Sequence, residues 1–329
     1  MTRTADTEAA FAPFVTILGR GPGRSRALTR DEARQAFGMV LAGEADPHQV
    51  GAFLMLLRFR GEDVDEITGM VEASRSAAGL HGSELQADID WPSYGAGRTR
   101  GAPWFLLAAL ALARSGVAVA MHGTNEFSAG ITVADALRAL DMTPADDVPA
   151  AARALRTGRF AYLPLAAFAP AVDDLLKLRR LFGLRSPVNT IARLLNPANA
   201  PAGVDGVFHP AYLEVHLGVA ERMRRPRLLV LKGGGGEAER VPTKPASVHV
   251  WDQEQGRSEL LLPADPGLEP LSPRTETPAL LAAVWRGDVE PPTVIATIQA
   301  TIALALLART RSLTPEQAAI NAAAIWRSR

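Results

Sequence analysis

Four cations gather within the segment KLRRLFGLR, residues 177–185, and they give the strongest indication of chemistry in this sequence. The whole chain carries 35 Lys and Arg residues against 35 Asp and Glu residues, so the local excess stands out from a neutral background. Gly183 is the residue type that ends a helix in the left-handed conformation, which places the cations around a helix end. They are Lys177, Arg179, Arg180 and Arg185. Such a cluster is suited to binding a polyanion through its phosphates.

A simple helix would show the same charges, and this alternative stays open. Asp173 and Asp174 fall in the first turn of a helix that begins near Pro170, and the cations fall in its last turn. That order complements the helix macrodipole, at about 0.3 to 1 kcal/mol for each charge. The spacing of apolar residues predicts one buried stripe on this helix. Its members are Ala171, Leu175, Leu178 and Phe182.

The composition is that of a globular chain with a large core. Hydrophobic residues make up 47% of the sequence and charged residues 21%, which is ordinary for such proteins. The absence of cysteine excludes disulfides, thiolate nucleophiles and cysteine-ligated metals. The first residues lack a signal-peptide core, and Arg114 interrupts the apolar stretch from Pro103. We therefore expect a cytoplasmic protein without a membrane partner.

Helix start signals are clear in the first third of the chain. Thr29 and Asp63 each precede an acidic residue three positions on, which is the pattern of a capping box, and Asp46 is a cap followed by proline at the first helical position. These signals predict three or four short helices between about residues 28 and 80. Thr277 and Thr314, each followed by proline, predict helices near the C-terminal end.

From Asp88 onward, apolar strands alternate with Ala- and Leu-rich helices. Residues 117–121 and 227–231 read as strands, and residues 103–113 and 133–140 read as helices. This order predicts an α/β fold in which helices flank a mostly parallel sheet, together with a smaller all-helical domain. We assign residues 1–85, with about 168–188, to the helical domain, and residues 86–167 and 189–329 to the α/β domain.

Several segments carry a resemblance to a known family. They are GEADPHQVGAFLMLLRFRGEDVDEITGM (43–70), MHGTN (121–125), LRSPVNTIARLLNPANAP (184–201) and the late SLTPEQAAINAAAIW. In these the chain resembles the glycosyltransferase family 3 superfamily, which contains anthranilate phosphoribosyltransferases and pyrimidine nucleoside phosphorylases. The resemblance implies the nucleoside phosphorylase/phosphoribosyltransferase-like fold, with a homodimer formed through the helical domain.

The family's glycine-rich GTGGD loop, which lets a diphosphate approach backbone amides, is altered here. The corresponding residues read DIDWPSYGAGRTR, 88–100. Pro92 lacks an N–H donor, and Trp91 and Tyr94 are bulky. We therefore expect the two aromatic side chains to fill the space of the diphosphate.

A second departure concerns magnesium, which needs hard oxygen ligands. Ala238 stands where the family places the first of two adjacent acidic residues, and Glu239 matches the second. Glu237 is a replacement candidate, and we expect Lys232 and Arg240 to compete for these carboxylates.

The family's substrate-recognition residues are also incomplete. The arginine that contacts anthranilate corresponds to Asp173, and a glycine-proline pair corresponds to Ala192-Arg193, which adds a cation. The residual candidates for a substrate pocket are His122, Gly123, Asn125, Asn189 and Glu239. Each of these residues also fits a structural role in a loop.

The departures themselves resemble one divergent branch of the superfamily, the YbiB-like proteins. The shared features are the stretch DWPSYGAGRTRGAPWFLLAALALA and the pattern KxRRxxGxR. Members of that branch bind nucleic acid with little sequence preference. The resemblance implies a nucleic-acid site made of Lys177, Arg179, Arg180, Arg185 and the added Arg193.

Our leading prediction is therefore a homodimer that binds single- or double-stranded nucleic acid on a degenerate phosphoribosyltransferase scaffold. It has no catalytic residue, no metal and no cofactor. The alternative is an active enzyme of the family, either a phosphoribosyltransferase or a nucleoside phosphorylase, which would use Mg²⁺. A third possibility is a protein-interaction scaffold whose basic surface meets an acidic partner.

Overall fold

The computed structural model describes residues 5–80, 84–95, 101–124, 126–272 and 275–329. Contacts within the chain define two compact units. The helical unit comprises Met1–Gly82 and Phe168–Leu195, and the sheet unit comprises Ser83–Ala167 and Asn196–Arg329. The fold class predicted from the sequence, a small helical domain and a larger α/β domain with a mostly parallel sheet, is confirmed.

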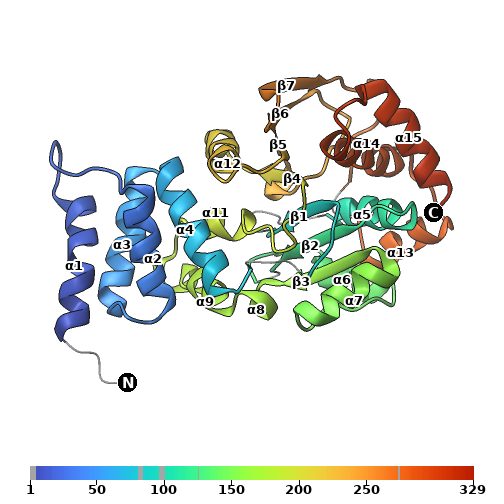
Figure 1. The fold of residues 1–329 in the computed structure, drawn as a ribbon. Coiled ribbons are helices and arrows are strands. Elements are labelled where there is room, and N and C mark those ends of the chain that lie inside the picture. Colours follow the sequence, from blue (N-terminus) through green and yellow to red (C-terminus); the bar gives the residue numbers. More distant parts are fainter. Residues whose placement is uncertain (1–4, 81–83, 96–100, 125, 273–274) are drawn as a thin grey trace. The chain divides into compact units, whose positions relative to one another are not determined.

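The helical unit is built from short helices that begin where the sequence predicts them (Figure 1). Thr29, Asp46 and Asp63 each form a complete capping box, because the cap accepts from a backbone N–H and the third residue accepts from the cap. The helices are α1 (Ala5–Gly19), α2 (Arg30–Leu41), α3 (Pro47–Arg60), α4 (Val64–Ala77), α9 (Pro170–Lys177), α10 (Arg179–Phe182) and α11 (Val188–Arg193), and α8 (Leu165–Phe168) lies at the unit boundary.

Helix α11 belongs to the helical unit, although the division drawn from the sequence placed residues 189–195 in the α/β domain. Two contacts explain its position. The Thr190 hydroxyl donates to Glu62 at 2.8 Å, and the guanidinium of Arg75 in α4 donates to the Leu195 carbonyl. The segment from α11 to Leu195 is thus hydrogen-bonded to Arg75 of α4 and to Glu62, which precedes α4.

The basic segment forms two helices and not the single helix that we predicted. The Leu178 N–H bonds to the carbonyl of Leu175, three residues back, which tightens the turn and separates α9 from α10. The buried side chains of α9 are consequently Val172, Asp173 and Leu176, and not the predicted stripe. Gly183 does end α10 in the left-handed conformation, with φ of 66°.

Helices α2 and α4 pack at very short range because of one glycine. A Cβ on Gly69 of α4 would lie 2.1 Å from the Arg30 carbonyl oxygen and 2.8 Å from the Arg34 amide nitrogen of α2. The carboxylate of Glu66, on the same helix, accepts a hydrogen bond from Leu28 N at 2.8 Å. The backbone approach and this buried bond hold the pair in one register.

The Gly69→Ala substitution should therefore lower the free energy of unfolding by about 2 to 3 kcal/mol or more, because backbone atoms cannot yield as a flexible side chain can. Gly38→Ala in α2 is a matched control, since no atom lies within 4 Å of the added Cβ. It should be neutral or stabilising by up to about 1 kcal/mol. Chemical denaturation followed by circular dichroism measures both, and equal effects would contradict the packing described.

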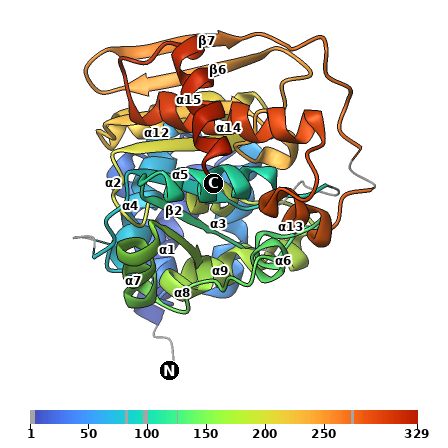
Figure 2. The same ribbon diagram turned by 90° about the vertical axis from the view of Figure 1, so that its right-hand side faces the viewer.

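The sheet unit contains seven strands in the order β3-β2-β1-β4-β5-β6-β7. The strands are β1 (Ile89–Ser93), β2 (Val119–Gly123), β3 (Phe160–Pro164), β4 (Ala202–Val207), β5 (Arg227–Lys232), β6 (Ala246–Asp252) and β7 (Gly256–Leu262). The first five are parallel, and β6 and β7 form an antiparallel hairpin at one end of the sheet (Figure 2). The sequence did not predict this hairpin.

The helices of the sheet unit cover both faces of the sheet (Figure 1). They are α5 (Trp104–Arg114), α6 (Val133–Ala139), α7 (Val148–Gly158), α12 (Ala211–Arg222), α13 (Pro278–Arg286), α14 (Pro292–Arg309) and α15 (Pro315–Arg327), with a 3₁₀ turn at Gly234–Gly236. Helix α12 packs on one face, while α5, α14 and α15 share the large apolar core on the other.

Strand β1 lies where the order of strands changes direction. It pairs with β2 along its full length but with β4 only at Ile89 and Asp90. Pro92 is tolerated in this interior strand because β4 is no longer paired at that point. Open α/β sheets bind ligands at such a switch point, outside the carboxyl ends of the strands.

Helix α14 is long and apolar enough to cross a membrane, and within the described residues it alone meets that test. Its apolar window is 61% buried in the protein, and Ile298, Ile302 and Leu304 belong to the core on the sheet. Its apolar character is therefore that of a core helix.

Candidate functional site

A small pocket lies at the switch point of the sheet unit. About 240 Å³ of space free of atoms lies within it, open solvent included. Ser93 ends β1, Thr124 follows β2, Phe105 lies in the first turn of α5, and Thr132 caps α6. The complete lining is Ser93, Gly95, Pro103, Phe105, Thr124, Ser128, Ile131, Thr132, Val133 and Glu237. Hydroxyl groups and one carboxylate thus surround the space at the carboxyl ends of the strands.

Backbone amides between β1 and α5 donate to carboxylates from distant parts of the chain. Gly95 N donates to Glu237 Oε1, and Phe105 N donates to Glu239 Oε2 at 2.9 Å. Ala102 N likewise donates to a carboxylate oxygen of Glu276. These three amides, called the cradle below, thus each donate to a negatively charged side chain, as amides in anion sites do.

Glu237 reaches the pocket because glycines let its backbone come close to the sheet. A Cβ on Gly233 would lie 1.7 Å from the Glu237 carbonyl oxygen, and one on Gly206 of β4 would lie 2.1 Å from its carbonyl carbon. Gly235 and Gly236 have φ of 66° and 78°, which reverses the chain after β5. The run of four glycines is the signal in the sequence that could have located this residue.

The Glu237 side chain is almost completely buried, with 1% exposure. Its Oε2 accepts no hydrogen bond from any residue that the structure describes. A buried carboxylate oxygen without a donor is costly, so it indicates an unused binding function.

The two aromatic residues expected to fill the diphosphate space do not line this pocket. Trp91 is fully buried in the apolar core, where its ring stacks on Phe105 with centroids 6.5 Å apart. The Tyr94 hydroxyl lies 2.9 Å from His122 Nδ1. Neither Trp91 nor Tyr94 is among the residues that line the pocket.

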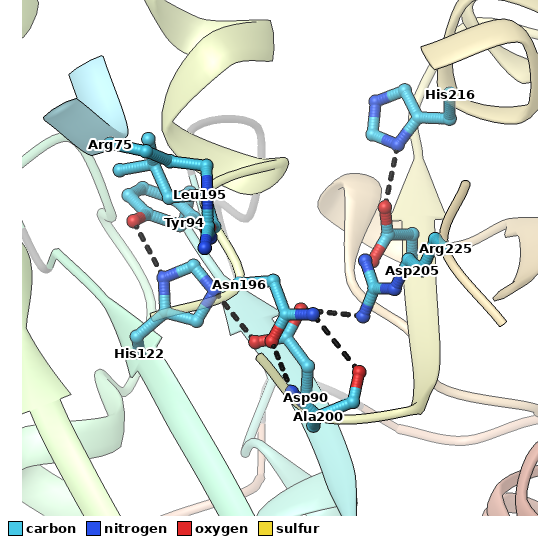
Figure 3. A network of polar contacts seen from close by, with 10 residues as sticks. All are labelled: Arg75, Asp90, Tyr94, His122, Leu195, Asn196, Ala200, Asp205, His216 and Arg225. Carbon is cyan, nitrogen blue, oxygen red and sulfur yellow. Dashed lines mark hydrogen bonds and ion pairs between the residues drawn. The ribbon is translucent and has the colours of Figure 1, made fainter. Parts of the chain in front are cut away.

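A buried polar network crosses the strands near the pocket (Figure 3). Asp90 Oδ2 pairs with Arg225 at 2.8 Å, and His122 Nε2 lies 3.3 Å from Asp90 Oδ1. A Cβ on Gly203 would lie 2.0 Å from the Arg225 guanidinium, so this glycine lets the side chain pass over β4. The network fixes Tyr94, His122 and Asp90 in one arrangement.

Electrostatics keep the buried Asp90 ionised. Burial by itself would raise the pKa of this carboxyl group, but the charges and hydrogen bonds of His122 and Arg225 outweigh it, and the pKa lies below its usual value. A second buried pair, Asp205 Oδ2 and His216 Nδ1 at 2.7 Å, joins β4 to α12 (Figure 3). Both pairs are structural supports beneath the strand ends.

The residual pocket candidates are not brought together as one group. His122 belongs to the buried network, and a Cβ on Gly123 would lie 1.6 Å from the Ser93 carbonyl oxygen. Asn189 lies in the helical unit, where its side chain accepts from Ser186 N at 3.2 Å. Glu239 accepts a hydrogen bond from Phe105 N in the first turn of α5, and Asn125 lies outside the described residues.

The five residues of the predicted nucleic-acid site all lie in the helical unit. Lys177 is paired with Asp173 at 2.7 Å and with Asp174 at 3.1 Å, and these hydrogen bonds raise its pKa. Each of the remaining members takes part in at least one interaction of its own: Arg179, Arg180, Arg185 and Arg193.

Among the residues that the structure describes, no group of three or more His, Asp or Glu side chains could hold a metal ion. Arg240 does not compete for the carboxylates as expected, since its guanidinium donates to the carbonyls of Val241 and Pro263. Because Mg²⁺ at phosphate sites is held by one or two carboxylates together with phosphate oxygens, an ion beside Glu237 or Glu239 would need phosphate oxygens as further ligands.

The fold and the cradle define a class of protein, and comparison with known families agrees with it. Residues 14–78 match the helical bundle domain of a glycosyl transferase family, and residues 105–326 match the a/b domain of the glycosyl transferase family. The second match alone covers more than half of the chain. The chain therefore belongs to the glycosyl transferase family 3 and anthranilate phosphoribosyltransferase superfamily.

Relatives extend over most of the sequence. The chain is 34% identical to an anthranilate phosphoribosyltransferase of Moorella thermoacetica over 90% of its own length and 83% of the relative's. It is 32% identical to the anthranilate phosphoribosyltransferase of Methylocella silvestris over 96% of its own length and 91% of the relative's.

Solved structures show the same fold. Anthranilate phosphoribosyltransferase from Thermus thermophilus has a TM-score of 0.76 at 26% identity, covering 97% of this chain and 94% of that one. Anthranilate phosphoribosyltransferase from Saccharomyces cerevisiae in complex with PRPP and Mg has a TM-score of 0.77 at 17% identity, covering 98% of this chain and 94% of that one.

These findings overturn the leading prediction from the sequence. The relatives are named as phosphoribosyltransferases and the structural neighbours as the same enzymes, so nucleic-acid binding is wrong as the main function. The enzymatic alternative, with its transferase class, is the one that the comparisons favour. Self-association stays a prediction.

Replacing Arg225 by methionine should lower the free energy of unfolding by about 3 to 5 kcal/mol at neutral pH, because it leaves Asp90 buried without its cation. The pKa of Asp90 is lowered in the folded protein. The pair's stabilisation is therefore complete above the ordinary carboxyl pKa of about 4 and is lost as the pH falls through the folded-state pKa. Urea titrations at several pH values measure the difference in the free energy of unfolding between the Arg225 variant and the unaltered protein. This difference should shrink below about pH 4.

Arg257→Met serves as the control, because Arg257 is an exposed arginine that pairs with Glu214 and Glu221. It should cost less than about 1 kcal/mol. An equally small loss in the Arg225 variant would contradict the role given to the buried pair.

Proposed function

We propose that the chain is a phosphoribosyltransferase that transfers a ribosyl phosphate group to a nitrogen acceptor. The observation that carries this proposal is the cradle in which the amides of Gly95, Ala102 and Phe105 donate to three carboxylates. In this proposal, phosphate oxygens of the donor would accept from these amides in place of the carboxylate oxygens. The family relationship supplies the class of reaction.

The reaction would break the bond between ribose C1 and the diphosphate oxygen, whose electron pair leaves with the diphosphate. A bond then forms between C1 and the acceptor nitrogen, which gives up a proton. Electrostatic stabilisation of the departing diphosphate by fixed amide donors is the contribution that this site offers. Magnesium would enter with the donor as part of a Mg–PRPP substrate complex, since the described residues form no cage of their own.

The acceptor is left open between anthranilate and other nitrogen compounds. Asp173, which corresponds to the arginine that contacts anthranilate in the family, is a buried carboxylate paired with Lys177. Asp173 and Lys177 form an ion pair within the helical unit, so this position does not identify the acceptor.

The resemblance to the YbiB-like branch stays a prediction about ancestry. The two stretches that carry it are part of the sequence whatever the activity is, and the altered β1 loop retains its anion-binding amides at Gly95 and Phe105. The branch resemblance and phosphoribosyl transfer are therefore compatible.

Ser128→Leu tests the pocket. The Ser128 hydroxyl would lie 3.3 Å from a Cβ on Gly95, so a larger apolar side chain should fill the space and weaken PRPP binding by about tenfold or more. Ala129→Leu is the matched control, because Ala129 is the exposed neighbour outside the pocket lining. It should leave binding unchanged.

The measurements are calorimetric binding of PRPP with MgCl₂ and release of pyrophosphate with a panel of neutral, cationic and anionic aromatic amines. Product masses identify the ribosylated acceptor. Absence of both binding and pyrophosphate release from the unaltered protein would refute the proposed function.

A further inference from the structure

We propose that Glu237 is a built-in competitor for the donor's phosphate and so sets the anion selectivity of the pocket. This inference rests on the proposed function. The key juxtaposition is the Glu237 carboxylate on the amide of Gly95, within the pocket at the end of β1.

The Glu237 carboxylate has the properties of a bound anion. The residue is only 1% exposed, one carboxylate oxygen accepts from Gly95 N, and the other accepts nothing from the described residues. An anion held by one amide is replaceable by an anion that can accept from several donors, because the remaining donors add to its binding.

The backbone of Glu237 cannot move aside. It is enclosed by Gly206 and Gly233, where added Cβ atoms would lie 2.1 Å and 1.7 Å from its main-chain atoms. Its carbonyl also accepts from Glu239 N at 2.9 Å. A phosphate that takes the Gly95 amide must therefore displace the side chain alone, by rotation about its own bonds.

Two negative groups cannot share this amide. A phosphate oxygen and a carboxylate oxygen that both sought Gly95 N would lie within a few ångströms of each other, where like charges repel strongly in a buried setting. Occupation by Glu237 and occupation by phosphate are therefore mutually exclusive. The affinity of the pocket for phosphate is therefore lower than that of the free amides, because part of the binding free energy is used to displace the Glu237 side chain.

The space around this contact is narrow and is lined by hydroxyl groups. Gly95 has no side chain, and the nearest atoms to a Cβ placed there are Ser128 at 3.3 Å and Glu237 Oε1 at 3.6 Å. The hydroxyls of Thr124 and Ser93 complete the lining. The pocket in this state accepts hydrogen-bond donors beside Glu237 and disfavours free anions.

Inorganic pyrophosphate is the probe for the test, used with the full chain. Glu237→Ala frees the amide and removes the charge, so it should bind pyrophosphate at least about tenfold more tightly than the unaltered protein, equivalent to about 1.4 kcal/mol or more. Glu237→Gln removes the charge but can still accept from Gly95 N. Its affinity for pyrophosphate should therefore lie between that of Glu237→Ala and that of the unaltered protein.

Glu214→Ala is the matched control, because it removes one acidic charge from an exposed position paired with Arg257. Its pyrophosphate affinity should equal that of the unaltered protein. Thermal unfolding of each variant verifies the fold, and the near-isosteric glutamine variant keeps the test valid if the alanine variant is unstable.

Hydrogen exchange of the Gly95 amide gives a second measure. Exchange should be slow in the unaltered protein, faster in Glu237→Ala, and slow again when pyrophosphate is added. Equal pyrophosphate affinities in all four proteins would overturn the role of Glu237 while leaving the phosphate cradle in place. Failure of every variant to bind pyrophosphate would overturn this inference, and only the additional absence of turnover would remove the proposed function.

Discussion

The need to satisfy backbone amides at the switch point is the constraint on which the sheet unit depends. Strand β1 leaves β4 after Asp90, and the first turn of α5 has amides without helical acceptors, so the amides at both places need other partners. Buried N–H groups without acceptors are costly, and carboxylates of Glu237, Glu239 and Glu276 supply the acceptors. These three residues come from the turn after β5 and from the segment before α13. The cradle thus joins parts of the chain that lie far apart in sequence.

Close backbone approach follows from the same constraint. Gly206 and Gly233 let the main chain of Glu237 lie against β4, and Gly203 lets the Arg225 side chain reach Asp90 across that strand. Each of these positions would place a Cβ within about 2 Å of another atom, so only glycine fits. The glycines therefore determine which charged groups meet beneath the strand ends. The function of the acidic residues depends on residues that contribute no chemistry of their own.

Local features were predictable from the sequence, whereas partners distant in the chain were not. The caps at Thr29, Asp46 and Asp63 depend on residues three positions apart, and the structure confirms all three. The pairing of Asp90 with Arg225 joins residues 135 positions apart, and no pattern in the sequence indicates it. The direction of Trp91 and Tyr94 also escaped prediction, because it depends on which face of β1 is the core. Lys177 was taken as an available cation, although both of its acidic partners lie within one helical turn.

The prediction of nucleic-acid binding was wrong for a physical reason that applies to other phosphate loops as well. A phosphate loop acts mainly through backbone amides, which every residue type except proline provides. Changes of side chain in such a loop therefore remove function only when a side chain enters the ligand's space or a proline replaces a donor. Here Pro92 lies within β1, where Trp91 turns into the core, and the donor at Gly95 remains. Side-chain identity alone could not distinguish a lost site from an altered one. The structure adds the positions of the amides, and the amide of Gly95 still faces the pocket at the end of β1.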